Sequence, residues 1–175
     1  MPRSDGGERT IPVEPQRQTL VTSSFDQQTL ARLPEAAFEN LLVVSTGLHP
    51  KRIERIVRER GHDPRQVGVL PVTGGDVDYD GPLWVADRTS PADLTGLSMR
   101  FSEAARHLEP GVGWVCVDSV STLYMYAASE RVYRFLSQLV SKLDAQSMTG
   151  VYCVSRGVLD DQEYARLSDL VDEVV

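Results

Sequence analysis

Short, continuous apolar runs alternate with stretches of helical periodicity from Gln18 onward, and this alternation most constrains the fold. The clearest runs are Leu41–Ser45, Gly113–Val117 and Gly150–Ser155. They lack the apolar–polar alternation of half-exposed strands, which is typical of strands buried on both faces. Strands that alternate with helices favour a parallel sheet between helical layers. The sequence therefore predicts a three-layer α/β fold, with a mostly parallel sheet and helices on both faces.

The same patterns place the remaining elements. Further strands are expected at Gln18–Ser23, Gln66–Val72, Leu83–Ala86 and, as an edge strand, Val174–Val175. Helical periodicity predicts a short helical stretch over Thr29–Phe38, interrupted at Pro34. It also predicts four helices, which begin at Pro50 and end at Gly61, begin at Ser90-Pro91, begin after a Ser129 cap, and begin at Asp160 or Asp161.

The first 17 residues, Met1–Arg17, differ from the rest because they are rich in Pro, Gly and charge. They contain no apolar core of a signal peptide, so we expect a disordered lead-in over 1–17 and one domain over 18–175. No apolar run approaches the roughly 18 residues that span a bilayer. A cytoplasmic location is therefore expected.

The net charge is −7, from 25 acidic and 18 basic residues, which argues against nucleic acid as the main partner. Only Lys51 and Lys142 are lysines. An acidic excess with scarce lysine favours a salt-adapted cytoplasm, although a GC-rich genome gives the same arginine bias. Cys116 and Cys153 lie inside apolar runs, where buried, unreactive thiols are expected.

Ligands of open α/β sheets bind beyond the carboxyl ends of the strands, so the loops there are the candidate sites. After the first strand, Ser23 and Ser24 offer hydroxyls to an anion, but the loop has no glycine and no lysine. The phosphate-binding pattern GxxxxGK[ST] occurs nowhere in the chain. The acidic loop Asp76–Gly81 lacks the distal glutamate of a calcium loop and is expected to be solvated.

The run Trp114–Val117 ends in Asp118, followed by Ser119. An apolar strand that ends in aspartate is similar to the Walker B element, whose carboxylate orients Mg²⁺. Many α/β strands end this way, and the alternative is that Asp118 only hydrogen-bonds a neighbouring loop. Asp118 and Ser119 are candidate ligand-binding residues, and Asp118 is a weak candidate for a metal ligand.

Two further segments are candidate interaction surfaces. Lys51, Arg52 and Arg55 lie in the charged helix after Pro50, where a solvated helix face is the alternative. Tyr124 and Tyr126 flank a methionine, and aromatic residues and methionine are enriched at interfaces, with ordinary packing as the alternative.

Several of these segments together resemble KaiC-like ATPases of the RecA superfamily. Leu41–Asp63 is similar to their second strand and helix, and Val112–Asp118 with Ser119–Leu123 is similar to their Walker B strand and the serine-rich loop after it. The resemblance spans nearly all of Gln18–Val175 and is nearest to uncharacterised, P-loop-less KaiC-like families of halophilic archaea. It implies a RecA-like fold.

The chain departs from these ATPases where catalysis needs residues. Ser23-Ser24-Phe25-Asp26 stands at the position of the P-loop, and Thr46-Gly47 stands where the family carries the glutamate that positions the attacking water. Without these groups, little of the electrostatic stabilisation of phosphoryl transfer is left. We therefore expect a pseudo-ATPase with no catalytic residue and no cofactor.

The resemblance and its departures together predict a non-catalytic protein-interaction module with a regulatory or signalling role. Its expected partners are proteins, including KaiC-like ATPases or further copies of the chain, and not nucleic acid or membrane. Two alternatives stay open: a nucleotide or small-anion sensor without turnover, and a half-site ATPase that a partner subunit completes.

Overall fold

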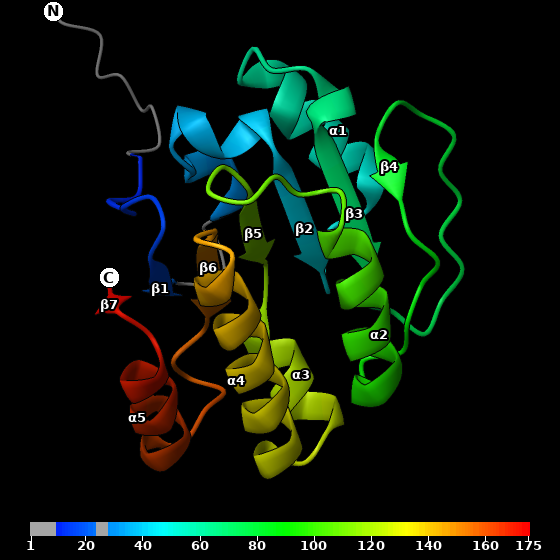
Figure 1. Cartoon of the computed structure of the whole chain (residues 1–175). Coiled ribbons are helices and arrows are strands. Elements are labelled where there is room, and N and C mark those ends of the chain that lie inside the picture. Colours follow the sequence, from blue (N-terminus) through cyan, green and yellow to red (C-terminus); the bar gives the residue numbers. More distant parts are fainter. Residues whose placement is uncertain (1–9, 24–27) are drawn as a thin grey trace, which may run out of the picture.

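The computed structural model describes residues 10–23 and 28–175. Within these residues, seven strands form one sheet in the order β4-β3-β2-β5-β6-β1-β7, and every strand pair is parallel (Figure 1). The strands are β1 (Gln18–Thr22), β2 (Leu41–Ser45), β3 (Val67–Pro71), β4 (Trp84–Val85), β5 (Trp114–Val117), β6 (Thr149–Val154) and β7 (Glu173–Val174).

Helices cover both faces of the sheet. The helices are η1 (Leu30–Arg32), η2 (Glu35–Glu39), α1 (Pro50–Glu59), η3 (Pro64–Gln66), α2 (Leu94–Ala105), α3 (Val120–Tyr126), α4 (Ser129–Ala145) and α5 (Asp161–Leu170). Along β2, Leu42 and Val44 pack with α2, α3, α4 and α5, whereas Leu41 and Val43 pack with η1, η2 and α1. The predicted three-layer α/β fold is thereby confirmed.

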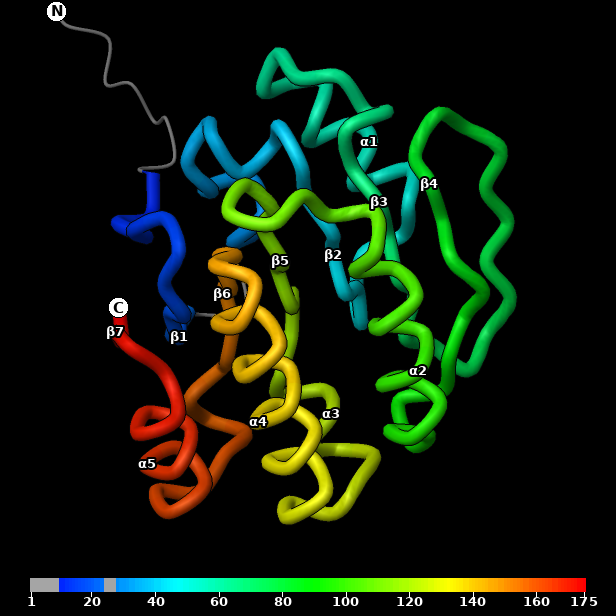
Figure 2. The backbone as a smooth tube through the Cα atoms, viewed as in Figure 1, coloured from blue at the N-terminus to red at the C-terminus, as the bar shows by residue number. Residues whose placement is uncertain are grey.

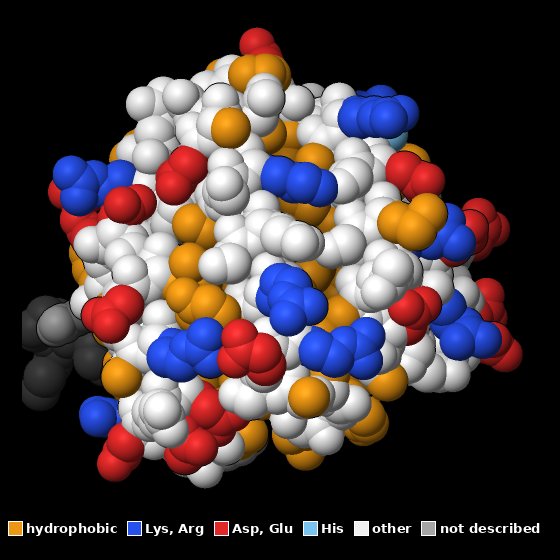
Figure 3. Space-filling model, turned by 60° about the horizontal axis from the view of Figure 1, so that its bottom comes forward, with side chains coloured by type: hydrophobic (Ala, Val, Ile, Leu, Met, Phe, Trp, Pro, Cys, Tyr) orange, Lys and Arg blue, Asp and Glu red, His pale blue; other side chains and the backbone are white. Residues whose placement is uncertain are grey.

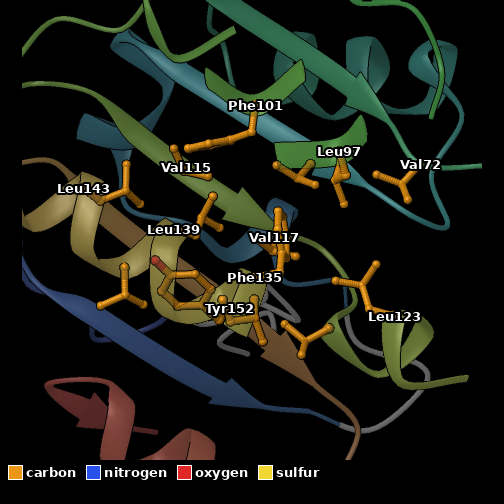
Figure 4. Packing of buried hydrophobic residues seen from close by; sticks show 14 of the residues in the cluster. Val72, Leu97, Phe101, Val115, Val117, Leu123, Phe135, Leu139, Leu143 and Tyr152 are labelled. Carbon is orange, nitrogen blue, oxygen red and sulfur yellow. The ribbon is translucent and has the colours of Figure 1, made fainter. Parts of the chain in front are cut away.

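The larger of the two cores lies under α2 and α4. Figure 4 shows Phe101 of α2 and Leu139 of α4 pointing toward Val115 of β5. Phe101 is 1% exposed and Val115 is fully buried. The long apolar stripe of α4 that the sequence shows is thus explained by burial against the centre of the sheet.

The sequence predicted a disordered lead-in over residues 1–17, and this is wrong for residues 10–17, which pack on the domain. Residues 1–9 lie outside the described residues. Ile11 and Val13 are buried in the core under α1, and the Ile11 backbone N–H donates to the carbonyl oxygen of Arg32. Gln16 also donates its backbone N–H to Thr149 Oγ1 at 2.7 Å. The domain therefore includes residues 10–17, because the apolar side chains of Ile11 and Val13 in this segment are buried.

Three details of the helices differ from the predictions. Ser119–Leu123, expected as a serine-rich loop, instead form the cap and first residues of α3. The helix expected from Ser90-Pro91 begins at Leu94, with Asp93 as its cap. Ser129 is the first residue of α4 and not its cap, because Ala128 holds the cap position. By contrast, α5 begins at Asp161, one of the two predicted start residues, and Asp160 caps it through a reciprocal capping box with Glu163.

The first and last strands lie side by side, as Figure 2 shows in blue and red. β7 pairs with β1 and forms one edge of the sheet, so the predicted edge strand near the C-terminus is confirmed at Glu173–Val174. Cys116 and Cys153 are buried free thiols, as expected. No helix in the described part of the chain is long and apolar enough to cross a membrane.

Candidate functional site

The order of the strands singles out one place at the carboxyl edge of the sheet. β2 and β5 are neighbours, but the chain leaves β2 toward β3 on one side and leaves β5 toward β6 on the other. Where connections diverge in this way, the loops separate and leave a crevice in which α/β proteins bind ligands. Asp118 follows β5 at this point, and Thr46 follows β2.

Asp118 is held by the loop that follows β2. Its Oδ1 atom accepts hydrogen bonds from the Thr46 backbone N–H at 2.7 Å and from Thr46 Oγ1 at 2.9 Å. Its Oδ2 atom accepts from Ser45 Oγ at 3.0 Å and from the Gly47 backbone N–H at 3.4 Å. An ionised carboxylate has about four lone-pair sites. Both Asp118 oxygens therefore have donors from the protein, although the single Ser45 hydroxyl proton is shared with the Leu48 carbonyl oxygen at 2.7 Å.

Burial and hydrogen bonding act on the Asp118 carboxyl in opposite directions. Loss of water raises its pKa above the ordinary value, and the bonds from Thr46, Ser45 and Gly47 lower it by a smaller amount. The net direction is upward, which indicates that desolvation outweighs the donors. The arrangement joins the ends of β2 and β5 and leaves no oxygen of Asp118 without a protein partner.

The serines near Asp118 serve the local structure. Ser119 caps α3 by accepting from the Thr122 backbone N–H at 3.3 Å, and it also accepts from Thr122 Oγ1 at 2.9 Å. Ser121 Oγ accepts from the Ser155 backbone N–H at 2.8 Å, which ties α3 to the end of β6. The Ser119 hydroxyl, a candidate ligand group in the sequence, is thereby used as a helix cap.

Ser23 and Asp118 are not brought together. β6 lies between β1 and β5, and two strand spacings amount to about 10 Å. The Ser23 backbone N–H donates to the Val154 carbonyl oxygen across the end of β6. Ser24, the other candidate of this loop, lies outside the described residues.

The cavity beside the β2 loop is small, and its lining contains the imidazole of His49 but no lysine or arginine. It has a volume of about 210 Å³ and is lined by Ser45–Pro50, Pro71–Thr73, Asp76 and Val77. Pockets for drug-sized ligands usually have about 300–1,000 Å³. Asp76 is its one carboxylate, which opposes a phosphate. Among the described residues, no group of three or more His, Cys, Asp or Glu side chains is placed to hold a metal ion.

The candidate interaction residues divide between two surfaces. Lys51, Arg52 and Arg55 are exposed on α1, whose apolar side packs on one face of the sheet. Tyr126 is 59% exposed at the end of α3, which packs on the opposite face, and Tyr124 is half-buried there. These residues therefore cannot form one continuous patch.

Sequence reasoning missed the residues that bind Asp118, namely Ser45, Thr46 and Gly47. Their signal was present, because polar and glycine residues follow a buried strand directly, as Asp118 does. What was not visible is that β2 and β5 are neighbours, since 68 residues separate Ser45 from Trp114 along the chain (114 − 45 − 1).

No curated protein matches the chain. A family described as "Family of unknown function (DUF7504)" matches residues 15–175, which include every strand and helix of the fold. By this match the chain belongs to the family of unknown function DUF7504.

Proposed function

We propose that this chain is a non-catalytic protein-interaction module on a RecA/KaiC-like scaffold, with a regulatory or signalling role in the cytoplasm. The observation that carries the proposal is the engagement of both Asp118 oxygens by the β2 loop. Asp118, the one residue that resembles an ATPase element, is thereby hydrogen-bonded within the protein and holds the β2 loop to the end of β5.

The energetics of Asp118 favour this role over metal binding. A Mg²⁺ ion or its water shell at this carboxylate would have to displace donors from Ser45, Thr46 or Gly47. Displacing the part-buried Thr46 backbone N–H would cost about 1–3 kcal/mol unless it found another acceptor, whereas the exposed Gly47 N–H can bind water. The chain has no P-loop lysine or phosphate-binding glycines, so contacts with a nucleotide would not offset the lost hydrogen bonds.

Calorimetric titration with ATP and Mg²⁺ in high-salt buffer tests the proposal. The wild-type chain is compared with Asp118→Asn, which keeps one carbonyl oxygen for Thr46 while removing the charge. We expect no saturable heat from either protein at millimolar nucleotide. Saturable binding that Asp118→Asn abolishes would overturn the proposal and establish a nucleotide sensor.

The half-site alternative is separated by a second measurement. ATP hydrolysis is followed for a KaiC-like ATPase alone, with the wild-type chain, and with Asp118→Asn. The interaction module changes hydrolysis by the partner equally with either protein, or not at all. A gain in hydrolysis that requires the Asp118 carboxylate would instead show that this chain completes a shared site.

A further inference from the structure

A groove between α2 and α4 has an unusual charge pattern for so acidic a chain. The two helices lie side by side and run in the same direction, and two cavities follow the seam between them. One has about 230 Å³ near the start of both helices, and the other has about 480 Å³ near their ends. Basic side chains line both cavities and no carboxylate lines either, although the chain has 25 acidic residues.

Four exposed cations border this groove: Arg131 and Arg134 at the first cavity, and Arg106 and Lys142 at the second. Within residues 10–23 and 28–175, none of the four forms an ion pair. The Lys142 ammonium instead donates to the Ser102 hydroxyl across the seam, at the second cavity.

Two acidic residues beside the groove, Glu130 and Glu103, pair with arginines that do not line it. Glu130, next to Arg131, binds Arg166 of α5 at 2.8 Å. Glu103 of α2 lies 3.9 Å from Arg100, beside a different cavity. Figure 3 shows basic side chains separated by hydrophobic surface across the middle of this face, with most acidic side chains toward its margins. The groove therefore keeps a local positive charge on a protein of net charge −7.

The floor of the groove is apolar. Phe135 and Leu94 lie under the first cavity, and Phe101, Leu143 and Met148 lie under the second. Exposed Pro110 and Ala145 extend this apolar surface at the end of the groove. An apolar floor between basic rims suits an amphipathic segment with acidic flanks, because its apolar side chains replace water and its carboxylates meet the free cations.

We propose that the α2–α4 groove binds an acidic amphipathic helix of a partner protein. α2 has 12 residues, a length of about 18 Å, which matches about three turns of a docked helix. Its apolar residues would be spaced i, i+3, i+4 and i+7, with Asp or Glu on both sides of that stripe. Nucleic acid fits less well, since a phosphate backbone offers nothing to the apolar floor and the rest of the surface repels it. The inference rests on the proposed function in one respect: the partner is taken to be a protein because the chain is proposed to be an interaction module.

The test uses a fluorescein-labelled helical peptide of about 14 residues, about 20 Å long, with leucines at the stated spacing and glutamates elsewhere. Its anisotropy is measured with the full chain in the lowest salt at which the chain stays folded. The double variant Arg131→Glu/Arg134→Glu should weaken binding at least about tenfold. The matched control Lys51→Glu/Arg55→Glu makes the same charge change on α1, over the other face of the sheet, and should stay within about twofold of wild type.

A further variant separates shape from charge. Ala145→Trp fills the end of the groove without changing its charge, and it should also abolish binding. A peptide of the same composition with its leucines scattered around the helix should not bind. Equal weakening by the two charge-reversal variants, or equal binding of the scattered peptide, would overturn the proposal. Absence of peptide binding, or preferential binding of duplex DNA at Arg131 and Arg134, would overturn it as well.

The outcome is independent of the nucleotide titration. A chain that binds the peptide and also ATP would contradict the proposed loss of the nucleotide site and leave the groove assignment standing. A chain that binds neither would contradict the groove assignment alone.

Discussion

The Asp118 carboxylate accepts a hydrogen bond from the Thr46 backbone N–H at 2.7 Å and thereby joins the ends of β5 and β2. Along the chain, these two strands are separated by α1, η3, β3, β4 and α2. In an ATPase, an aspartate at the end of such a strand is directed at the metal. Here it is directed at the neighbouring loop. The Asp118 carboxylate therefore contributes to the structure at this edge of the sheet.

Removing this carboxylate tests the structural role. Asp118→Ala leaves the Thr46 backbone N–H without its acceptor, whereas the Ser45 and Thr46 hydroxyls keep the carbonyl oxygens of Leu48 and Ser119. The free energy of unfolding should therefore fall by about 1–3 kcal/mol. Asp118→Asn keeps one oxygen in place and should cost less than about 1 kcal/mol. Urea denaturation measures both, with Asp78→Ala in the exposed acidic loop as a control that should change stability by no more than about 0.5 kcal/mol. Equal effects of Ala and Asn would contradict the role of the hydrogen bonds.

The raised pKa of Asp118 gives a pH dependence of known sign. A carboxyl with a higher pKa in the folded state holds its proton more tightly there than in the unfolded chain. The stability that this shift contributes is therefore fully present below the ordinary pKa of 3.8 and is lost as pH rises through the folded pKa. Above the folded pKa, this group causes no further change in stability with pH. Wild type should lose stability relative to Asp118→Asn over that window, as followed by urea midpoints at successive pH values. A gain with rising pH would show that the donors outweigh desolvation.

A buried polar contact between the first and sixth strands gives a second stability test. Tyr152 OH donates to Gln18 Oε1 at 2.7 Å, and Gln18 Nε2 donates to the Met148 carbonyl oxygen at 3.0 Å. Tyr152→Phe leaves the buried Gln18 oxygen unpartnered and should lower the free energy of unfolding by about 1–3 kcal/mol. Tyr126→Phe, at a tyrosine that is 59% exposed, is the matched control and should have little effect. A similar result for both variants would refute the assignment.

The N-terminal segment gives a third test. Ile11 is 3% exposed in the core under α1, so Ile11→Ala should lower the free energy of unfolding by about 2–4 kcal/mol. Thr10→Ala, at the exposed neighbour, should be nearly neutral. Thermal melting of the two variants beside wild type measures the difference. If Ile11→Ala melts with wild type, the segment before Gln18 contributes nothing to the domain.

The elements that depend on local pattern were predicted well. β2 and β5 are continuous apolar runs, and α4 has a long apolar stripe, so their existence follows from periodicity alone. The helix α3 was missed because its seven residues, Val120–Tyr126, include serine, threonine and two tyrosines, which are weak helix formers. It forms because Val120 and Leu123 are buried against the sheet, a tertiary effect.

Sequence by itself determined the layered α/β class, the absence of a P-loop pattern and the aspartate that ends β5, because each depends on residues close together in the chain. Tertiary structure alone decided the partners of Asp118, the use of Ser119 as a helix cap and the separation of Ser23 from Asp118 by β6. It also decided that Arg131, Arg134, Arg106 and Lys142 border one groove. Strand order and helix packing set these relationships, and both arise from burial between segments far apart in the sequence, which no local pattern encodes.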